Sequence, residues 1–233
     1  MATKTCTLGA DGDYRVLVQS NGITLDGNGH TLAGNATEIA NDAITVAGKT
    51  GVTIKNITLT DFSYGVHLLY ADGNSVSNIN ATGNLGAGIS LSNSNYNTLT
   101  DNVIVNFFSD TGICIGYAST HNILSHNHLA NADRGIYVHD YSSYNTFSDN
   151  TLTANLNAIT LADYDSNCII SNNIIATNTA AVWLYNGSNN NVISGNTISN
   201  NASGLYISNG AINNQTYHNN FLGNRNFQAA VVG

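Results

Sequence analysis

Hydrophobic and polar residues alternate in short runs that recur along almost the whole chain. One run consists of a small residue, an aliphatic residue, a variable residue and a second aliphatic residue. Copies of this run occupy residues 65–68, 88–91, 112–115, 135–138, 158–161, 181–184 and 204–207. Successive copies begin 23 or 24 residues apart. Such alternation is typical of β-strands, in which neighbouring side chains point to opposite faces.

A second apolar run, bounded by asparagines, follows about ten residues after each copy of the first. It occupies residues 97–102, 122–127, 145–150, 167–172, 191–196 and 214–219. A third short run follows its last asparagine, so each period contains three short strands and three turns. We expect the last asparagines to stack as an internal ladder that pairs backbone groups at the turns. This ladder is predicted to contain Asn56, Asn78, Asn102, Asn127, Asn150, Asn172, Asn196 and Asn219.

The period fits two kinds of solenoid. Leucine-rich repeats have 20–29 residues, but here the return segment is rich in Ser, Thr, Asn and β-branched residues, which form helices poorly. A left-handed β-helix has a six-residue period, which is absent. The sequence therefore predicts an all-β, right-handed parallel β-helix of about 8–10 turns of 22–25 residues. We expect an N-terminal cap over 1–21, the β-helix over 22–225, and a C-terminal end over 226–233 that is truncated or covered by a second copy.

Composition agrees with this fold and narrows the function. Proline, which cannot donate to a strand ladder, is absent, whereas the chain has 39 Asn. Lys and Arg total six and the net charge is −8, so no basic cluster exists and nucleic-acid binding is excluded. No apolar run approaches 18 residues, so we expect no membrane span. The three cysteines, Cys6, Cys114 and Cys168, cannot all pair internally and do not indicate a compartment.

Several segments resemble the NosD-type, or CASH (carbohydrate-binding and sugar-hydrolase), β-helix family. The similar segments are Gly-Ile-Thr-Leu-Asp-Gly-Asn-Gly-His-Thr-Leu at 22–32, Gly-Val-Thr-Ile-Lys-Asn-Ile at 51–57, the units at 97–102 and 191–196, and Tyr-His-Asn-Asn-Phe at 217–221. The resemblance covers residues 20–225. It implies a parallel β-helix and an extracellular, cell-surface or periplasmic location, although no signal peptide is visible in this sequence. Family members include polysaccharide lyases, epimerases and hydrolases.

The resemblance also carries a link to copper-enzyme maturation, which no residue here supports specifically. No catalytic motif of the family can be transferred residue by residue.

Aromatic side chains are concentrated on the outward face of the first strand and on the turn beyond it. Sugars stack on flat rings and hydrogen-bond to Asp, Asn and His, so this strip suits an extended polysaccharide. The alternative is that outward aromatics are simply good strand formers that stack on one another. The predicted carbohydrate-binding residues are His67, Tyr117, Tyr141, Tyr164, Trp183, Tyr185 and Tyr206.

The same face contains the candidate catalytic residues Tyr137, His139, Asp140 and Asp163. Asp140 and Asp163 occupy equivalent positions on adjacent turns, so their carboxylates are expected about 5 Å apart, a spacing that suits a retaining glycosidase. Tyr137, His139 and Asp140 also resemble the acid–base sets of uronate epimerases and lyases. The cation that such an enzyme needs is supplied by Arg134 alone. A solvated turn in which the aspartates cap backbone groups is the alternative.

A metal site is the remaining candidate. His126 and His128 flank the inward Asn127, and Asp101 and Asp149 are predicted to lie on the turns before and after His126. These residue types suit a divalent cation, and an acid–histidine stack without any cofactor is the alternative.

Three classes of function stay open. The leading one is a module that binds polysaccharide along one sheet face. The second is a polysaccharide-modifying enzyme, namely a uronate lyase, C5-epimerase or glycoside hydrolase. The third is a structural domain that binds no glycan and self-associates through the aromatic strip or through the C-terminal end.

Overall fold

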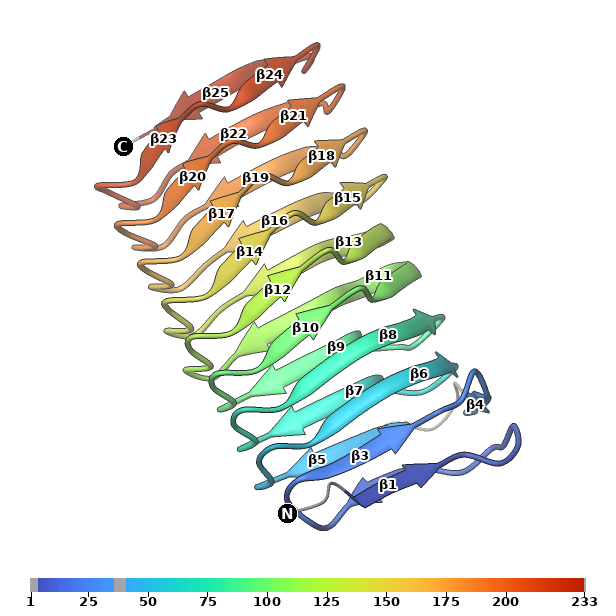
Figure 1. Cartoon of the computed structure of the whole chain (residues 1–233). Helices are drawn as coiled ribbons and strands as arrows, with labels where there is room; N and C mark the ends of the chain where they lie inside the picture. Colours follow the sequence, from blue (N-terminus) through green and yellow to red (C-terminus); the bar gives the residue numbers. More distant parts are fainter. Residues whose placement is uncertain (1–3, 36–40, 233) are drawn as a thin grey trace.

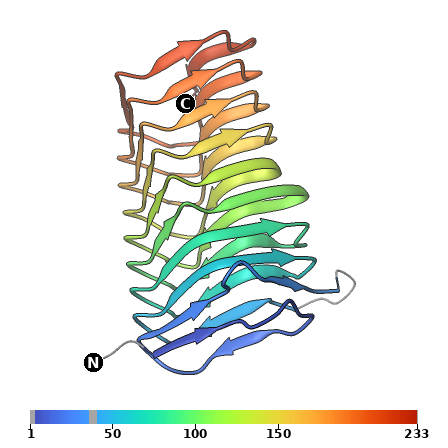
Figure 2. The ribbon, with the colours of Figure 1, turned by 45° about the vertical axis from the view of Figure 1, so that its right-hand side comes forward.

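The computed structural model describes residues 4–35 and 41–232, and all regular elements in that part are β-strands. Figures 1 and 2 show a stack of coils that runs from the N-terminal end to the C-terminal end. Strands on successive turns pair in parallel, for example β7 (Tyr64–Leu69) with β9 (Ala87–Ser92). The structure confirms the predicted parallel β-helix, with about ten turns and three strands in a typical turn.

The strands form three long parallel sheets along the stack. Sheet A contains β7, β9, the ends of β11 (Val103–Gly116) and β13 (His128–Val138), and β2 (Val16–Val18), β5 (Ile44–Ala47), β16 (Asn157–Leu161), β19 (Ala180–Leu184), β22 (Ser203–Ile207) and β25 (Phe227–Val231). Sheet B contains the first parts of β6 (Thr53–Thr60) and β8 (Ser75–Thr82), with β1 (Lys4–Thr7), β3 (Ile23–Asp26), β10 (Thr98–Thr100), β12 (Ile123–Ser125), β14 (Thr146–Ser148), β17 (Ile169–Ser171), β20 (Val192–Ser194) and β23 (Gln215–Tyr217). Sheet C contains the ends of β6 and β8, the first parts of β11 and β13, and β4 (Thr31–Ala33), β15 (Thr151–Thr153), β18 (Ile174–Ala176), β21 (Thr197–Ser199) and β24 (Asn220–Leu222).

Inward aliphatic side chains fill the coil. In sheet A the residue after each small residue is fully or almost fully buried, and these residues stack as Val66, Ile89, Ile113, Ile136, Ile159, Val182 and Leu205. Each such side chain stabilises the coil by roughly 1.5–3 kcal/mol. The small residue itself is needed because strands approach closely there. A Cβ on Gly112, for instance, would lie 2.7 Å from the carbonyl oxygen of Gly135.

An asparagine ladder lies at the turn from sheet B to sheet C, as predicted, but three of its expected members were wrong. Asn102, Asn127, Asn150, Asn173, Asn196 and Asn219 form the ladder, in which each side-chain oxygen accepts a backbone N–H from the preceding turn at 2.9–3.1 Å. Asn56, Asn78 and Asn172 lie one residue earlier and have φ between 51° and 57°. In the first turns Ile79 occupies the ladder column, and its N–H donates to Asn102.

The ends of the described chain join the same stack. β1 pairs with β3, β2 pairs with β5, and β25 pairs with β22. Over residues 4–35 and 41–232 we find no helix long and apolar enough to cross a membrane.

Candidate functional site

The outward face of sheet A presents its side chains in columns. The register places Thr45, His67, Ser90, Cys114, Tyr137, Thr160, Trp183 and Tyr206 in one column. The column two residues later contains Leu69, Ser92 and Gly116, followed by His139, Ala162, Tyr185 and Ser208. Small side chains therefore separate some of the large ones along the stack, as Thr160 separates Tyr137 from Trp183. The small side chains of Ser90 and Thr160 are 5% and 1% exposed, because their larger neighbours cover them.

The end of β13 carries four side chains in contact with one another. The guanidinium of Arg134 lies 4.1 Å from the centre of the Tyr137 ring, and this ring stacks on His139 with centroids 4.8 Å apart. Nδ1 of His139 lies 2.9 Å from Oδ2 of Asp140. Burial raises the pKa of the Tyr137 phenol above its ordinary value, and the Tyr185 hydroxyl adds to this while Arg134 opposes it. The phenol is therefore neutral at neutral pH.

His139 also contacts the preceding turn. Its Nε2 lies 3.4 Å from Sγ of Cys114, and the Tyr117 ring meets the imidazole edge-on with centroids 5.5 Å apart. Gly116 makes room for this arrangement, because a Cβ there would lie 2.4 Å from Nε2 of His139. Burial raises the pKa of the Cys114 thiol to about 12.

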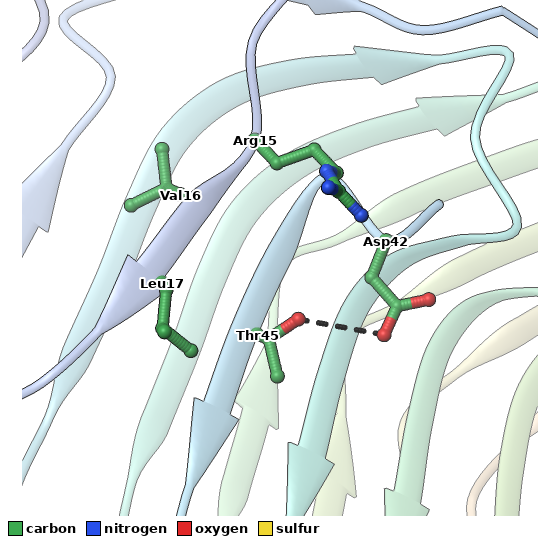
Figure 3. Close-up of a pocket in the computed structure, with 5 residues that line it drawn as sticks. All are labelled: Arg15, Val16, Leu17, Asp42 and Thr45. Atoms are coloured by element: carbon green, nitrogen blue, oxygen red, sulfur yellow. Dashed lines mark hydrogen bonds between the residues drawn. The ribbon is translucent and has the colours of Figure 1, made fainter. Parts of the chain in front are cut away.

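A second histidine contacts side chains on both neighbouring turns nearer the N-terminus. Nδ1 of His67 lies 2.9 Å from Oδ2 of Asp42, and its Nε2 lies 3.5 Å from Oγ of Ser92, at the limit of a hydrogen bond. The Tyr64 ring packs on the imidazole with centroids 4.9 Å apart. Asp42 also accepts the Thr45 hydroxyl at 3.4 Å, as Figure 3 shows.

A cavity of about 400 Å³ opens beside Asp42. It is lined by the five residues drawn in Figure 3, which are Arg15, Val16, Leu17, Asp42 and Thr45. Arg15 and Asp42 both line this cavity, so the N-terminal end of the face combines a cation with a hydrogen-bonded acid.

Toward the C-terminal end the face becomes a row of rings. Trp183 packs on Tyr185 with centroids 4.7 Å apart and on Tyr206 at 6.1 Å, and Tyr206 continues to Phe227 at 5.7 Å. The indole N–H of Trp183 donates to Oγ of Ser208 at 3.3 Å. The rings contact one another in tilted pairs and remain half-buried, so each still presents part of its surface to the solvent.

The turn from sheet A to sheet B is lined with exposed tyrosines in an unusual backbone conformation. Tyr70, Tyr117, Tyr141 and Tyr164 are 55–65% exposed and have φ between 50° and 71°. Other turns place Asn or Gly at the equivalent positions, such as Asn93 and Gly187. A left-handed conformation is unfavourable for a bulky L-residue by roughly 1–2 kcal/mol, so retaining tyrosines here opposes stability.

The stack of Tyr141 on Tyr164, with centroids 5.2 Å apart, ends beside an open cavity. This cavity has a volume of about 560 Å³ and is lined by Asp163, Tyr164, Asn186, Gly187, Asn209 and Gly210. It exists because the two glycines provide no ring to continue the stack. Amide and carboxylate groups thus border the last tyrosine ring.

The two candidate aspartates lie on adjacent turns, and the backbone N–H of Tyr141 donates to the carbonyl of Asp163 at 3.0 Å. Their carboxylates have different partners. Asp140 contacts His139, whereas Oδ1 of Asp163 accepts the side-chain amide of Asn186 at 2.9 Å.

Asp101, His126 and Asp149 occupy equivalent positions on three turns, as the sequence predicted. No group of three His, Cys, Asp or Glu side chains is close enough to hold a metal ion among residues 4–35 and 41–232. His121 instead lies between the Tyr96 and Tyr144 rings, at 4.9 and 5.1 Å.

Sequence reasoning missed several contacts. Cys114, Ser92 and Asp42 were not selected as site residues, because a pattern of strands does not reveal which side chains lean across to another turn. The missed signal was the pairing of each histidine with a carboxylate and with a hydroxyl or thiol on a neighbouring turn of the face.

The chain belongs to the NosD family. The family described as periplasmic copper-binding protein (NosD) matches residues 7–155 and 104–231, which together cover nearly the whole sequence. No curated protein matches the chain.

Solved structures of carbohydrate-active proteins share the fold. The periplasmic alginate epimerase AlgG has a TM-score of 0.69 and 17% identity, over 82% of this chain and 50% of that protein. An alginate lyase from Paenibacillus sp. has a TM-score of 0.64 and 15% identity, over 98% and 91%. The A-module of the Azotobacter vinelandii mannuronan C-5 epimerase AlgE6 has a TM-score of 0.67 and 16% identity, over 100% and 81%. These are right-handed β-helices, which is the predicted hand, and this chain spans about half the length of AlgG.

The copper in the family's description is not matched by a ligand set in the described residues. Cys114 and His139 supply one sulfur and one nitrogen ligand in contact, but no third His, Cys, Asp or Glu completes a site there. A soft-metal site needs more protein ligands than this pair.

Proposed function

We propose that the outward face of sheet A binds an extended polysaccharide that runs along the stack. The observation that carries this proposal is the row of rings from Tyr137 to Tyr206, bordered on one side by polar side chains. That border contains Asp140, Asp163, Asn186 and Asn209, and the cavity beside Tyr164 opens onto it. Half-buried aromatic rings with hydroxyl, indole and imidazole groups match the mixed apolar and hydroxylated surface of a sugar chain.

The charges favour a glycan without carboxylates. Asp140 and Asp163 lie on the turn that borders this face, and Asp110 and Asp133 lie just before its strands, at the opposite edge. Burial and the nearby Asp133 raise the pKa of Asp110. Arg134 is the cation there, and its Nε lies 4.0 Å from Oδ2 of Asp133. A polyuronate would bring one carboxylate per sugar against this acidic surface, which is unfavourable. Alginate is named for the similar structures, but we therefore do not expect it to be the ligand of this chain.

Isothermal titration with neutral glycans (a β-glucan, a mannan and a galactan) and with alginate tests the proposal. We expect binding to at least one neutral glycan, and a loss of about tenfold or more in affinity for Trp183→Ala or Tyr185→Ala. Tyr217→Ala is the matched control, because Tyr217 is 47% exposed on sheet B, away from this face. Absence of binding across the panel, or an equal loss in the control, would contradict the proposal.

A second candidate is catalysis on the same glycan, and the contact chain Arg134–Tyr137–His139–Asp140 favours it. His139 is oriented by Asp140 as a general base, and the neutral Tyr137 phenol is placed to donate a proton. Asp140→Asn would then abolish the formation of shortened sugars by hydrolysis while leaving affinity within about twofold. If the glycan stays unmodified after prolonged incubation with the wild-type protein, catalysis is contradicted and binding alone is supported.

We also propose that the protein works outside the cytoplasm, because the family it belongs to is described as periplasmic. Fractionation of the producing cells tests this location.

A further inference from the structure

Cys114, His139 and Asp140 have the mutual arrangement of a nucleophile, a base and the group that orients the base. The two nitrogens of His139 have separate partners. Nε2 lies 3.4 Å from Sγ of Cys114, and Nδ1 lies 2.9 Å from Oδ2 of Asp140. A carboxylate on Nδ1 fixes the tautomer whose Nε2 is free to accept a proton, and that nitrogen is the one facing the thiol.

The surroundings of Cys114 distinguish it from the other cysteines. Cys6 is exposed, and Cys168 is fully buried, where its thiol contacts the backbone carbonyls of Ser142 and Ser166. Cys114 is partly exposed on the outward face of sheet A. Burial keeps its thiol neutral at neutral pH, so a neighbouring base is required to make it reactive.

The space around the thiol is limited. On the same face Ser90 precedes Cys114 in its column and Tyr137 follows it, and Gly116 lies two residues later in the chain. Small side chains therefore border Sγ on the sides of Ser90 and Gly116. The Tyr117 ring closes the side toward the turn by its contact with His139. A short acyl group fits these surroundings better than a long one.

We propose that Cys114 is the nucleophile of an acyl-transfer site for short-chain carboxylic esters, with His139 as general base and Asp140 as a positioning residue. Sγ attacks the ester carbonyl and a C–S bond forms, while Nε2 of His139 accepts the thiol proton. The C–O bond to the alcohol breaks, and His139 returns the proton to the departing oxygen. Water, deprotonated by His139, then attacks the thioester, which releases the carboxylic acid and restores the thiol.

p-Nitrophenyl acetate is the probe. We expect a burst of p-nitrophenolate and one acetyl group on Cys114, located by peptide mass spectrometry of the acid-quenched protein. Cys6→Ser is the matched control and keeps the burst. His139→Asn and His139→Gln are expected to slow acylation by about a hundredfold. Circular dichroism checks that each variant retains its β-structure.

Gly116→Ala provides a test that removes none of the three side chains. The new Cβ would displace the imidazole from Cys114, so acylation falls as it does in the His139 variants. Asp140→Asn is expected to slow acylation, because the imidazole loses the carboxylate that orients it, and Asp140→Glu is expected to restore part of the rate. If Asp140 had a purely structural role, Asp140→Glu would not restore acylation. The proposal is overturned if Cys114 acquires no acetyl group, or if it is acetylated equally fast without His139.

Discussion

Asn172 and Asn173 are neighbours in the chain, but their side chains have opposite environments. Asn173 is fully buried, and its Oδ1 accepts the backbone N–H of Asn150 at 2.9 Å while its Nδ2 donates to Asn196 and to the carbonyl of Phe147. Asn172 is exposed on the turn, with a φ of 56°. The ladder therefore depends on one asparagine of the pair.

Asn173→Ala is expected to lower the free energy of unfolding by about 3 kcal/mol, because it leaves buried donors and acceptors on three turns without partners. Asn172→Gly is the control and changes stability by less than about 0.5 kcal/mol, since glycine accepts the positive φ. Denaturant unfolding measures both. If the two substitutions changed the free energy of unfolding equally, the hydrogen bonds of the ladder would make no specific contribution to stability.

Asp165 makes stability depend on pH. It lies in a buried column between Ser142 and Ser188, and its Oδ1 accepts the N–H of Ser142 at 2.7 Å. Burial raises the pKa of Asp165 from 3.8 to about 8, so the folded state favours the protonated acid. Its stabilising contribution is complete below about pH 4 and is lost as the pH rises toward 8.

Asp165→Ser should therefore remove a loss of folding stability on the order of 5 kcal/mol between these pH values, because each pKa unit corresponds to about 1.4 kcal/mol. Thermal unfolding of wild type and variant at several pH values measures this. Asp101→Asn, a change to an exposed carboxylate, is expected to leave the profile as in wild type. If the stability of wild type and of Asp165→Ser changed with pH in the same way, Asp165 would not be the source of the pH dependence.

Tyr70→Asn is expected to stabilise the protein. Tyr70 is 65% exposed with a φ of 50°, and Asn93 occupies the same position one turn later. Asparagine adopts this conformation more readily, so we expect a gain of about 1 kcal/mol and a rise in Tm of about 2–4 °C. Scanning calorimetry measures the change. A fall in Tm would mean that the ring stabilises the turn through contacts that outweigh the strain.

Replacing the exposed acids should alter which glycans bind. Asp140→Asn together with Asp163→Asn removes two negative charges from the face, so we expect weaker exclusion of alginate and little change for a neutral glycan. Titrations at low and high salt measure the difference, because salt screens the charge repulsion but not the ring contacts. Unchanged alginate behaviour at low salt would show that these two charges do not determine specificity.

The fold was predictable from sequence because the period and the alternation both survive in nearly every turn. The prediction of the ladder failed in the turn that contains Cys168. Cys168 occupies the position at which neighbouring turns have an asparagine, and the sequence alignment placed Asn167 there instead. This shifted the predicted ladder residue from Asn173 to Asn172. The ring columns followed directly from the strand register. The contact of His139 with Cys114 did not, because it depends on an imidazole that leans over Gly116 into the preceding turn. Tyrosines at positive φ are equally invisible to patterns that expect Asn or Gly in turns.

The sheet A register gives the face a modular length. Asn157 pairs with Ala180, so the segment between them is one complete turn, and its outward side chains, Thr160 and Ala162, are small. Excising residues 157–179 would bring Tyr137 beside Trp183 without requiring a new type of loop. Insertion or deletion of a whole turn therefore changes the length of the face in steps of about 4.8 Å. The length of ligand that the face binds best is then set by the number of turns.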